Sequence, residues 1–253
     1  MKLSEVKELL DIKYQQFNTI DFIKDDPIAI PHQFSKKQDI EIAALLVATI
    51  AWGNRKMILK SGEKLLQIMD YQPYDFVANY DIEDSNRLKF VHRTFNSEDL
   101  HFFFNALNKI YSEKDSLEAV FKPQKDLPGV KGRIVSFREA MLETPHEHRS
   151  AKHLSNPLKK SAAKRLNMFL RWMVRKDENG VDFGIWNSIS PAELYLPLDV
   201  HTGNVARKLK LLKRKQNDWQ ALEEVMKKLR KFDPIDPVKY DYSLFGLGVY
   251  EGI

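Results

Sequence analysis

Apolar residues recur three to four positions apart along most of the chain, which is the spacing of one face of an α-helix. Ser4 is a good N-cap for the first such segment, and Ser35 with Gln38 reads as a capping box before the second. Alternating stretches that would indicate paired strands are absent from the sequence, as are internal repeats. We therefore expect an all-α fold. The predicted helices cover residues 6–17, 40–52, 56–69, 88–121, 134–142, 161–175, 201–212, 219–229 and 240–249.

The most apolar segment, residues 40–52, is too short for a membrane span, which needs about 20 apolar residues. A buried core helix explains it better. Residues 1–5 lead directly into the amphipathic pattern, with no apolar stretch after a basic start, so the sequence shows no secretory signal. We expect a cytoplasmic monomer that has no membrane partner.

The chain of 253 residues contains no cysteine. This excludes a disulfide framework, zinc–thiolate sites and a cysteine-ligated iron–sulfur cluster, and it fits a reducing compartment. His146 and His148 lie close in sequence but have no convincing third ligand. We therefore expect neither a metal site nor a cofactor.

The distribution of charge says more than the net charge of +5. Residues 149–176 contain nine Lys or Arg and no Asp or Glu, and six of the nine residues in 207–215 are basic. Either run alone is explained as well by a solvated basic face as by a phosphate-binding surface. Two runs that flank one candidate site favour a phosphate-binding surface.

Two short segments in the C-terminal half carry the residues that point to a chemistry. The first, residues 161–172, opens a predicted helix with Lys164 and Arg165. The second, residues 196–202, reads Leu-Pro-Leu-Asp-Val-His-Thr and places Asp199 just before the next helix. Together they resemble the helix-hairpin-helix DNA glycosylase superfamily. In that superfamily a hairpin leads into a helix near a catalytic lysine, and a segment reading roughly V-D-T/V-H/R delivers a catalytic aspartate.

The resemblance implies a two-lobed helical fold over residues 1–253, with one lobe built from both chain ends and the other from the middle of the chain. It also implies that Lys164 and Asp199 are the catalytic pair of a DNA repair N-glycosylase, with AP-lyase activity left open. The long stretch between them, 176–196, is closest to the archaeal 8-oxoguanine glycosylase branch, which favours an oxidised purine as the damaged base. Over nearly its full length the chain also resembles a bacterial family of uncharacterised function, which names no activity.

The segment before the lysine departs from the superfamily pattern. The superfamily hairpin reads L-P-G-V-G, whereas residues 156–161 read Asn-Pro-Leu-Lys-Lys-Ser and lack the glycines that let backbone N–H groups approach a phosphate. We expect Lys159 and Lys160 to hold the phosphate by charge instead. Residues 127–132 look more like the hairpin, but they lie almost seventy residues before Asp199 with at least one helix between, so we interpret them as a decoy.

The residue types suit the removal of a base. Cleaving a base from deoxyribose develops positive charge on the sugar, which a carboxylate stabilises, and the carboxylate also takes a proton from an attacking amine or water. Helix N–H groups hold an aspartate at a helix N-terminus in place and favour its ionised form. A lysine attacks the sugar carbon and forms a Schiff base once its amine is neutral, which burial and a neighbouring cation such as Arg165 favour.

Several alternatives remain open. Asp199 could be an N-cap and nothing more. Lys160 could replace Lys164 as the nucleophile, or water could attack while Lys164 binds phosphate. In a different class, the chain is a non-catalytic DNA- or RNA-binding module that retains the fold. The degenerate hairpin favours that module, and the presence of both Lys164 and Asp199 favours the enzyme.

The partner that the resemblance implies is duplex DNA. Tryptophan and phenylalanine near the candidate pair could stack on a flipped base, although such residues more often belong to the core. The base-pocket candidates are Trp52, Trp172, Trp186 and Phe245. The expected DNA-binding residues are Lys159, Lys160, Ser161, Arg165, His201 and Arg207, of which His201 is more typical of a structural role.

Overall fold

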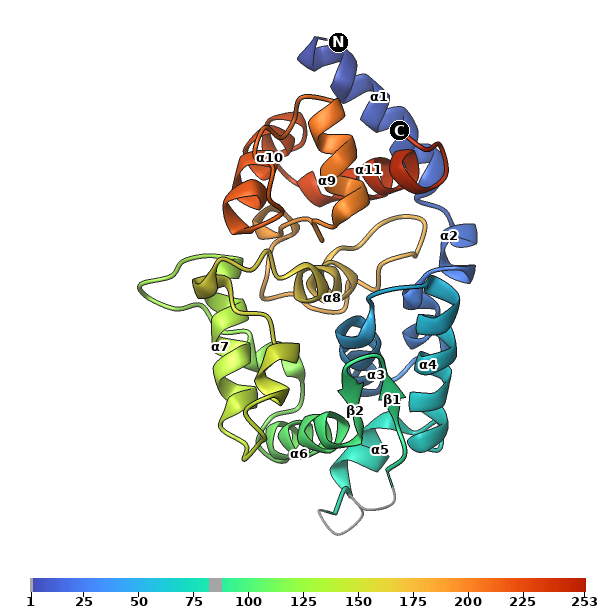
Figure 1. Ribbon diagram of the computed structural model, residues 1–253, viewed down its shortest axis with the longest axis vertical. Coiled ribbons are helices and arrows are strands. Elements are labelled where there is room, and N and C mark those ends of the chain that lie inside the picture. The colour runs from blue at the N-terminus through green and yellow to red at the C-terminus, as the bar shows by residue number, and fades with distance from the viewer. Residues whose placement is uncertain (1, 82–87) are drawn as a thin grey trace. The chain divides into compact units, whose positions relative to one another are not determined.

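The computed structural model describes residues 2–81 and 88–253, and these residues are mostly helical, as expected (Figure 1). The chain divides into two compact units. The terminal unit comprises residues 1–24 and 157–253 and so contains both chain ends, and the middle unit comprises residues 25–156. Over the described residues, no helix has both the length and the apolar character needed to cross a bilayer.

The terminal unit is organised around its last helix. That helix packs against both the first helix and the helix that follows Asp199, so most of its residues are buried. A Cβ at Gly246 would come within 2.1 Å of the Phe17 ring, and one at Gly248 within 3.1 Å of Val205, so these glycines permit the close packing. The helices are α1 (Leu3–Phe17), α2 (Ile20–Lys24), α8 (Lys164–Val174), α9 (Val200–Lys208), α10 (Trp219–Phe232) and α11 (Tyr240–Val249), with 3₁₀ turns at Pro157–Lys159, Pro191–Glu193 and Pro237–Lys239.

The middle unit has its own core, built around a helix that is buried on nearly every side. One charged side chain on that helix, Glu41, is completely buried and accepts hydrogen bonds from the Tyr111 hydroxyl at 2.7 Å and the Leu117 N–H at 3.0 Å. The carboxylate therefore joins three elements of the unit. The elements of the middle unit are α3 (Lys37–Ile50), α4 (Arg55–Ile68), α5 (Pro73–Ala78), β1 (Val91–His92), β2 (Phe95–Asn96), α6 (Ser97–Glu113) and α7 (Val130–Leu142), with 3₁₀ turns at Pro27–Ala29, Pro31–Gln33, Leu117–Val120 and Ser150–His153.

The prediction of one helical stretch over residues 88–121 was wrong at its end, where α6 stops at Glu113 and Leu117–Val120 form a separate 3₁₀ turn, and at its start. Two-residue strands β1 and β2 pair there as a small antiparallel hairpin, and α6 begins only at Ser97. Asn96 and Asp99 explain the boundary, because each side chain accepts a hydrogen bond from the backbone N–H of the other, at 3.2 and 3.0 Å.

Other helix starts also differ from the sequence prediction. α1 begins at Leu3 with Lys2 as its N-cap, so Ser4 lies inside the helix and does not cap it, and α8 begins at Lys164 rather than at residue 161.

α3 begins at Lys37 after Lys36, with no side-chain cap, so the capping box predicted at Ser35 does not form. α7 begins at Val130 rather than four residues later, because Gly129 turns into the helix with a φ of 72°. The glycine-containing segment interpreted as a decoy therefore starts α7 and lies in the middle unit, whereas Asp199 lies in the terminal unit.

Candidate functional site

Lys164 is the first residue of α8, at the end of a tight loop. Within the loop Lys160 and Ala163 take positive φ values of 66° and 47°, the left-handed conformation that glycine adopts most easily. The Ser161 hydroxyl accepts a hydrogen bond from the Ala163 N–H at 3.2 Å and supports the second of these turns. The backbone thus makes the turns without glycine and presents Lys164 at the start of the helix.

Asp199 is the N-cap of α9, and hydrogen bonds hold both its side-chain carboxylate and its backbone carbonyl in place. One carboxylate oxygen, Oδ1, accepts a hydrogen bond from the Thr202 N–H at 2.9 Å. Its carbonyl oxygen accepts from the Gly203 N–H at 2.9 Å and from the Asn217 side-chain amide at 2.7 Å. These contacts leave the second carboxylate oxygen, Oδ2, to face Lys164.

Lys164 and Asp199 form a partly exposed pair. The distance from Lys164 Nζ to Asp199 Oδ2 is 3.9 Å, and the two side chains are 33% and 20% exposed. At this distance the ammonium and the carboxylate attract each other without a direct hydrogen bond. The start of α8 thus presents an amine and the start of α9 presents a fixed negative charge, side by side and open to solvent.

The loop before α8 lies beside the second basic run. The Trp219 N–H donates to the Lys160 carbonyl at 3.0 Å, and Ser161 forms a backbone bridge with Asp218. This contact brings the exposed side chains of Lys159 and Lys160 to the segment that carries exposed lysines 213 and 215. Two basic segments that are distant in sequence thus share one part of the terminal unit.

Arg207 organises that second segment from within. Its guanidinium donates to the carbonyl oxygens of Arg214 and Lys215, both at 2.8 Å, and to the Asn217 side chain at 2.5 Å. His201 is exposed in the first turn of α9, while Arg165 is half-buried, and burial lowers the pKa of its guanidinium to about 10. The structure therefore brings Lys159, Lys160 and Ser161 to one exposed loop. The Arg207 side chain holds the neighbouring segment 214–217 through its hydrogen bonds.

The basic run 149–176 is not one continuous solvated surface. Arg149 lies in the middle unit, where it contacts the buried Asp99 carboxylate at 2.8 Å. Arg171 and Arg175 have side chains that are 4% and 1% exposed and are ion-paired inside the terminal unit. The expectation that the whole run faces phosphate is wrong for these two arginines, because sequence composition alone does not separate buried from exposed cations.

The four base-pocket candidates are placed differently from one another. Trp172 and Trp186 are 0% and 2% exposed core residues of the terminal unit. Phe245 is partly buried against Phe22 and Tyr242, also in the terminal unit. Trp52 belongs to the middle unit, where its ring stacks on His153 with centroids 6.0 Å apart.

Three cations lie along one face of α8 and its C-cap residue. Lys164, Arg171 and Arg175 follow each other at i, i+7 and i+11, so the second and third lie within about 20° of the first around the helix axis. Each cation meets one or more carboxylates, and these eight side chains are named the ion-pair cluster here. Its contacts are Lys164–Asp199 at 3.9 Å, Arg171–Asp182 at 3.2 Å, Arg171–Asp241, Arg175–Asp177 at 2.6 Å, Arg175–Asp182 at 3.0 Å and Arg175–Asp236 at 2.8 Å.

The ion-pair cluster holds five carboxylates against three cations, and most of it is buried. Burial raises the pKa of the Asp241 carboxyl to about 7; the charges of Asp199 and Asp182 also raise it, while Arg171 and Lys164 oppose the rise. Burial likewise raises the pKa of Asp236, against the opposing charge of Arg175. The excess of negative charge is thus relieved by carboxyl groups that take up protons more readily than usual.

Sequence reasoning missed these carboxylates. Asp182 and Asp236 lie in irregular segments and Asp241 begins an apolar helix, so none follows a recognisable motif. The usable signal was the spacing of the three cations on α8, since two arginines on an otherwise apolar helical face must have buried partners.

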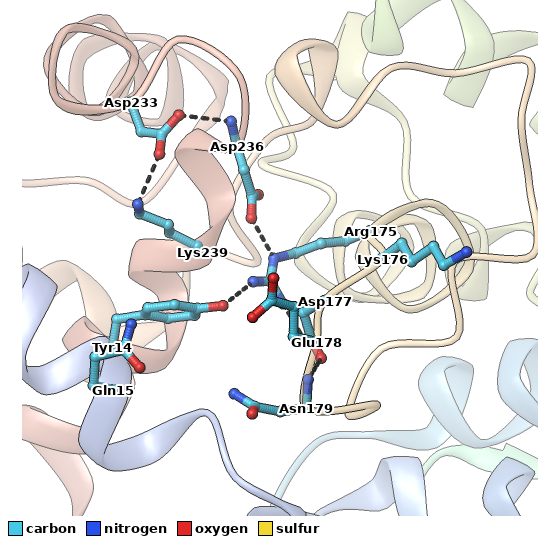
Figure 2. Close-up of a pocket in the computed structure, with 10 residues that line it drawn as sticks. All are labelled: Tyr14, Gln15, Arg175, Lys176, Asp177, Glu178, Asn179, Asp233, Asp236 and Lys239. Atoms are coloured by element: carbon cyan, nitrogen blue, oxygen red, sulfur yellow. Dashed lines mark hydrogen bonds and ion pairs between the residues drawn. The ribbon is translucent and has the colours of Figure 1, made fainter.

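An open pocket of about 610 Å³ lies where the cluster ends at Arg175 (Figure 2). Figure 2 shows the Arg175 guanidinium held between Asp236 and the Tyr14 hydroxyl, at 2.8 and 2.6 Å. Lys239 contacts Asp233 at 2.7 Å on the same wall. The charged groups drawn there mainly neutralise one another. The lining residues are Tyr14, Gln15, Arg175, Lys176, Asp177, Glu178, Asn179, Asp233, Asp236 and Lys239.

Across residues 2–81 and 88–253, no three His, Cys, Asp or Glu side chains gather so as to hold a metal ion.

The chain was compared with protein families, curated proteins and solved structures. No curated protein and no solved structure matches it. One family model, described as a protein of unknown function (DUF2400), matches residues 26–250, which include Lys164, Asp199 and the rest of the ion-pair cluster. The chain therefore belongs to the DUF2400 family.

Proposed function

We propose that the chain has a glycosylase-like fold and acts as a DNA N-glycosylase with Lys164 and Asp199 as its catalytic pair. The observation that carries the proposal is the 3.9 Å approach of the Lys164 ammonium to the Asp199 carboxylate at the starts of two helices. Exposed Lys159 and Lys160 lie on the loop that leads to Lys164 and suit the phosphates of duplex DNA. The resemblance described above favours an oxidised purine as the damaged base.

The proposed reaction uses both members of the pair. A damaged nucleotide leaves the base stack and places its sugar against the pair. As the bond between base and sugar breaks, the bonding electrons leave with the base, and the Asp199 carboxylate stabilises the positive charge on the sugar. The neutral amine of Lys164 forms a bond to the same sugar carbon, and the proton that its nitrogen then sheds passes to Asp199, while the departed base takes a proton from solvent. The C–O bond of the sugar ring then breaks and the ring oxygen takes a proton, which leaves a protonated Schiff base. Elimination of the 3′ phosphate from that intermediate then cuts the strand.

Borohydride trapping tests the nucleophile. Reduction of the Schiff base should leave a covalent protein–DNA adduct, which Lys164→Ala should abolish and Lys160→Ala should retain, because Lys164 is the lysine beside Asp199. The adduct is measured by its slower migration in a denaturing gel. An adduct that disappears only in Lys160→Ala would move the role to that residue, and base release without any adduct would indicate a water nucleophile.

Binding to undamaged duplex DNA tests the partner. Affinity should fall with salt with a log–log slope of about −0.9 for each phosphate contacted, and the double charge reversal Lys159→Glu/Lys160→Glu should weaken binding by a similar factor on every sequence. The matched control is Lys227→Glu/Lys231→Glu, two exposed lysines of α10 outside both basic runs. Equal losses from the two double variants would show that net charge, and not this loop, binds the DNA.

One observation favours the alternative of a non-catalytic DNA- or RNA-binding module, namely that the loop before α8 turns without glycine. Incubation with duplexes that each carry a single lesion separates the two proposals. Strand cleavage before alkali indicates glycosylase and lyase activity, and cleavage only after alkali indicates base release alone. Tight binding of every duplex with no cleavage in either condition would favour the module.

A further inference from the structure

The Asn217 side chain connects Asp199 to the segment that follows α9. Its amide nitrogen, Nδ2, donates to the Asp199 carbonyl at 2.7 Å, and its amide oxygen, Oδ1, accepts from the Arg207 guanidinium at 2.5 Å. The two contacts fix the orientation of the amide, because a flipped side chain would place its NH₂ group against the guanidinium. Asn217 thus holds one particular group of the candidate pair, the backbone of Asp199.

Gly203 makes room for this contact. It lies inside α9, where glycine is less favourable than alanine by about 0.5–1 kcal/mol. A Cβ at this position would come within 2.7 Å of Asn217 Oδ1, 2.8 Å of Asn217 Nδ2 and 3.0 Å of Arg207 Nη1. An alanine at position 203 would therefore push the Asn217 amide away from the Asp199 carbonyl. The helix thus contains an unfavourable residue where the Asn217 side chain lies against it.

The 214–219 segment, which carries this amide, also holds the loop before α8. The Trp219 N–H donates to the Lys160 carbonyl at 3.0 Å. Within the segment, the Arg214 guanidinium donates to both carboxylate oxygens of Asp218, at 2.7 and 2.5 Å, and this bidentate pair stiffens it. One short segment therefore contacts the backbone on both sides of the candidate pair.

We propose that Asn217, anchored by Arg207, is a positioning residue that holds the Asp199 carboxylate beside Lys164. The proposal rests on the proposed function for its role in base removal. The Gly203 N–H donates to the Asp199 carbonyl at 2.9 Å without the help of Asn217, so α9 forms in the absence of the amide. What the amide adds is a link from the Asp199 backbone to the segment that holds the Lys164 loop. Loss of that link frees the 3.9 Å separation of the two side chains to change.

Zero-length cross-linking measures this separation without DNA. A water-soluble carbodiimide activates the Asp199 carboxylate, the Lys164 amine attacks it, and an amide bond forms as the carbodiimide leaves as a urea. Only directly adjacent side chains react, and the joined peptides are quantified by mass spectrometry. The exposed pair Lys109–Glu143, 3.0 Å apart in the middle unit, forms its own cross-link in the same sample and serves as the internal standard.

Asn217→Asp removes the donor to Asp199 but keeps an acceptor for Arg207. This variant should lose most of the cross-link of the candidate pair, while the internal standard keeps its wild-type yield. Asn108→Asp is the matched control, because Asn108 is also partly buried and its amide donates to two backbone carbonyls of the middle unit, at 2.9 and 3.1 Å. The control should keep both cross-links.

Gly203→Ala displaces the Asn217 amide without changing any charge, and it covers the case in which Asn217→Asp does not fold. It too should lose most of the cross-link of the candidate pair. A wild-type yield in Gly203→Ala would overturn the inference, because a loss in Asn217→Asp alone would be an effect of the added charge. A wild-type yield in folded Asn217→Asp, or no such cross-link in the wild type, would overturn it as well.

Base release and DNA affinity separate this inference from the proposed function. If both are right, Gly203→Ala releases base about 10²-fold more slowly, the usual effect of a displacement of about 1 Å at reacting groups, and binds duplex DNA as the wild type does. Loss of the cross-link together with no base release by the wild type supports the positioning by Asn217 and rejects the glycosylase. Loss of the cross-link with base release at the wild-type rate rejects the positioning role and leaves the proposed function standing.

Discussion

Asp199→Asn should abolish most base release while the protein still folds and binds DNA. Asparagine keeps the shape of the side chain and also caps helices well, so the hydrogen bond from the Thr202 N–H survives. The substitution removes the negative charge beside Lys164 and the ability to accept a proton. Electrostatic and acid–base contributions of this kind are each worth roughly 10²–10⁴-fold in rate. Affinity for DNA should stay constant or rise, because a negative charge near phosphates is lost.

Melting temperature, DNA affinity and base release must be measured on the same preparations. Asp26→Asn is a matched control, because Asp26 is another N-cap aspartate, it lies in the middle unit, and its carboxylate accepts from the Ile28 N–H at 3.1 Å. Both variants should lose at most about 1 kcal/mol of stability, and only Asp199→Asn should lose activity. Base release at the wild-type rate in Asp199→Asn would show that Asp199 is a helix cap and nothing more.

Arg175→Met should lower the free energy of unfolding by about 3–5 kcal/mol. The guanidinium contacts Asp177, Asp182 and Asp236 and donates to the Tyr14 hydroxyl. Methionine fills part of the volume but leaves three mainly buried carboxylates without their shared cation. Burial already raises the pKa of Asp236 against the charge of Arg175, so without Arg175 this carboxyl takes up a proton more readily, and the difference from the wild type should shrink as the pH falls.

Urea denaturation of the wild type and of Arg175→Met at several pH values measures this loss. Lys109→Met is the control, because Lys109 pairs with Glu143 at 3.0 Å while both side chains remain well exposed. Such a surface pair contributes about 0–1 kcal/mol. A loss from Arg175→Met no larger than that of the control would mean that the buried network does not stabilise the fold.

The helices could be predicted from sequence wherever an apolar face is long and regular. The spacing of Leu166, Leu170 and Met173 predicted α8, and the structure confirms a helix over Lys164–Val174. Boundaries were less reliable, because they depend on single side chains. Asn96 caps α6 through a contact with Asp99, and the short hairpin before it contains only two residues in each strand, too few to produce an alternating pattern.

The candidate pair could be singled out from sequence because both residues lie at helix starts within recognisable segments. The buried part of the cluster could not, because its partners come from irregular segments whose path is set by tertiary packing. Asp182 follows Val181 in a loop, yet its carboxylate bridges two arginines of α8. Trp172 was named as a base-pocket candidate although tryptophan is more often core, and packing places it in the core of the terminal unit.

The packing of α1 against α11 has a consequence for synthesis on the ribosome. The middle unit is continuous in sequence and can complete its core as soon as residue 156 has left the exit tunnel. α1 is made first but must wait for α11, with Val6 and Leu10 uncovered, for about 10–45 s at ~5–20 residues per second. During that interval the apolar face of α1 stays exposed, and the terminal unit completes its core only after α11 has been made.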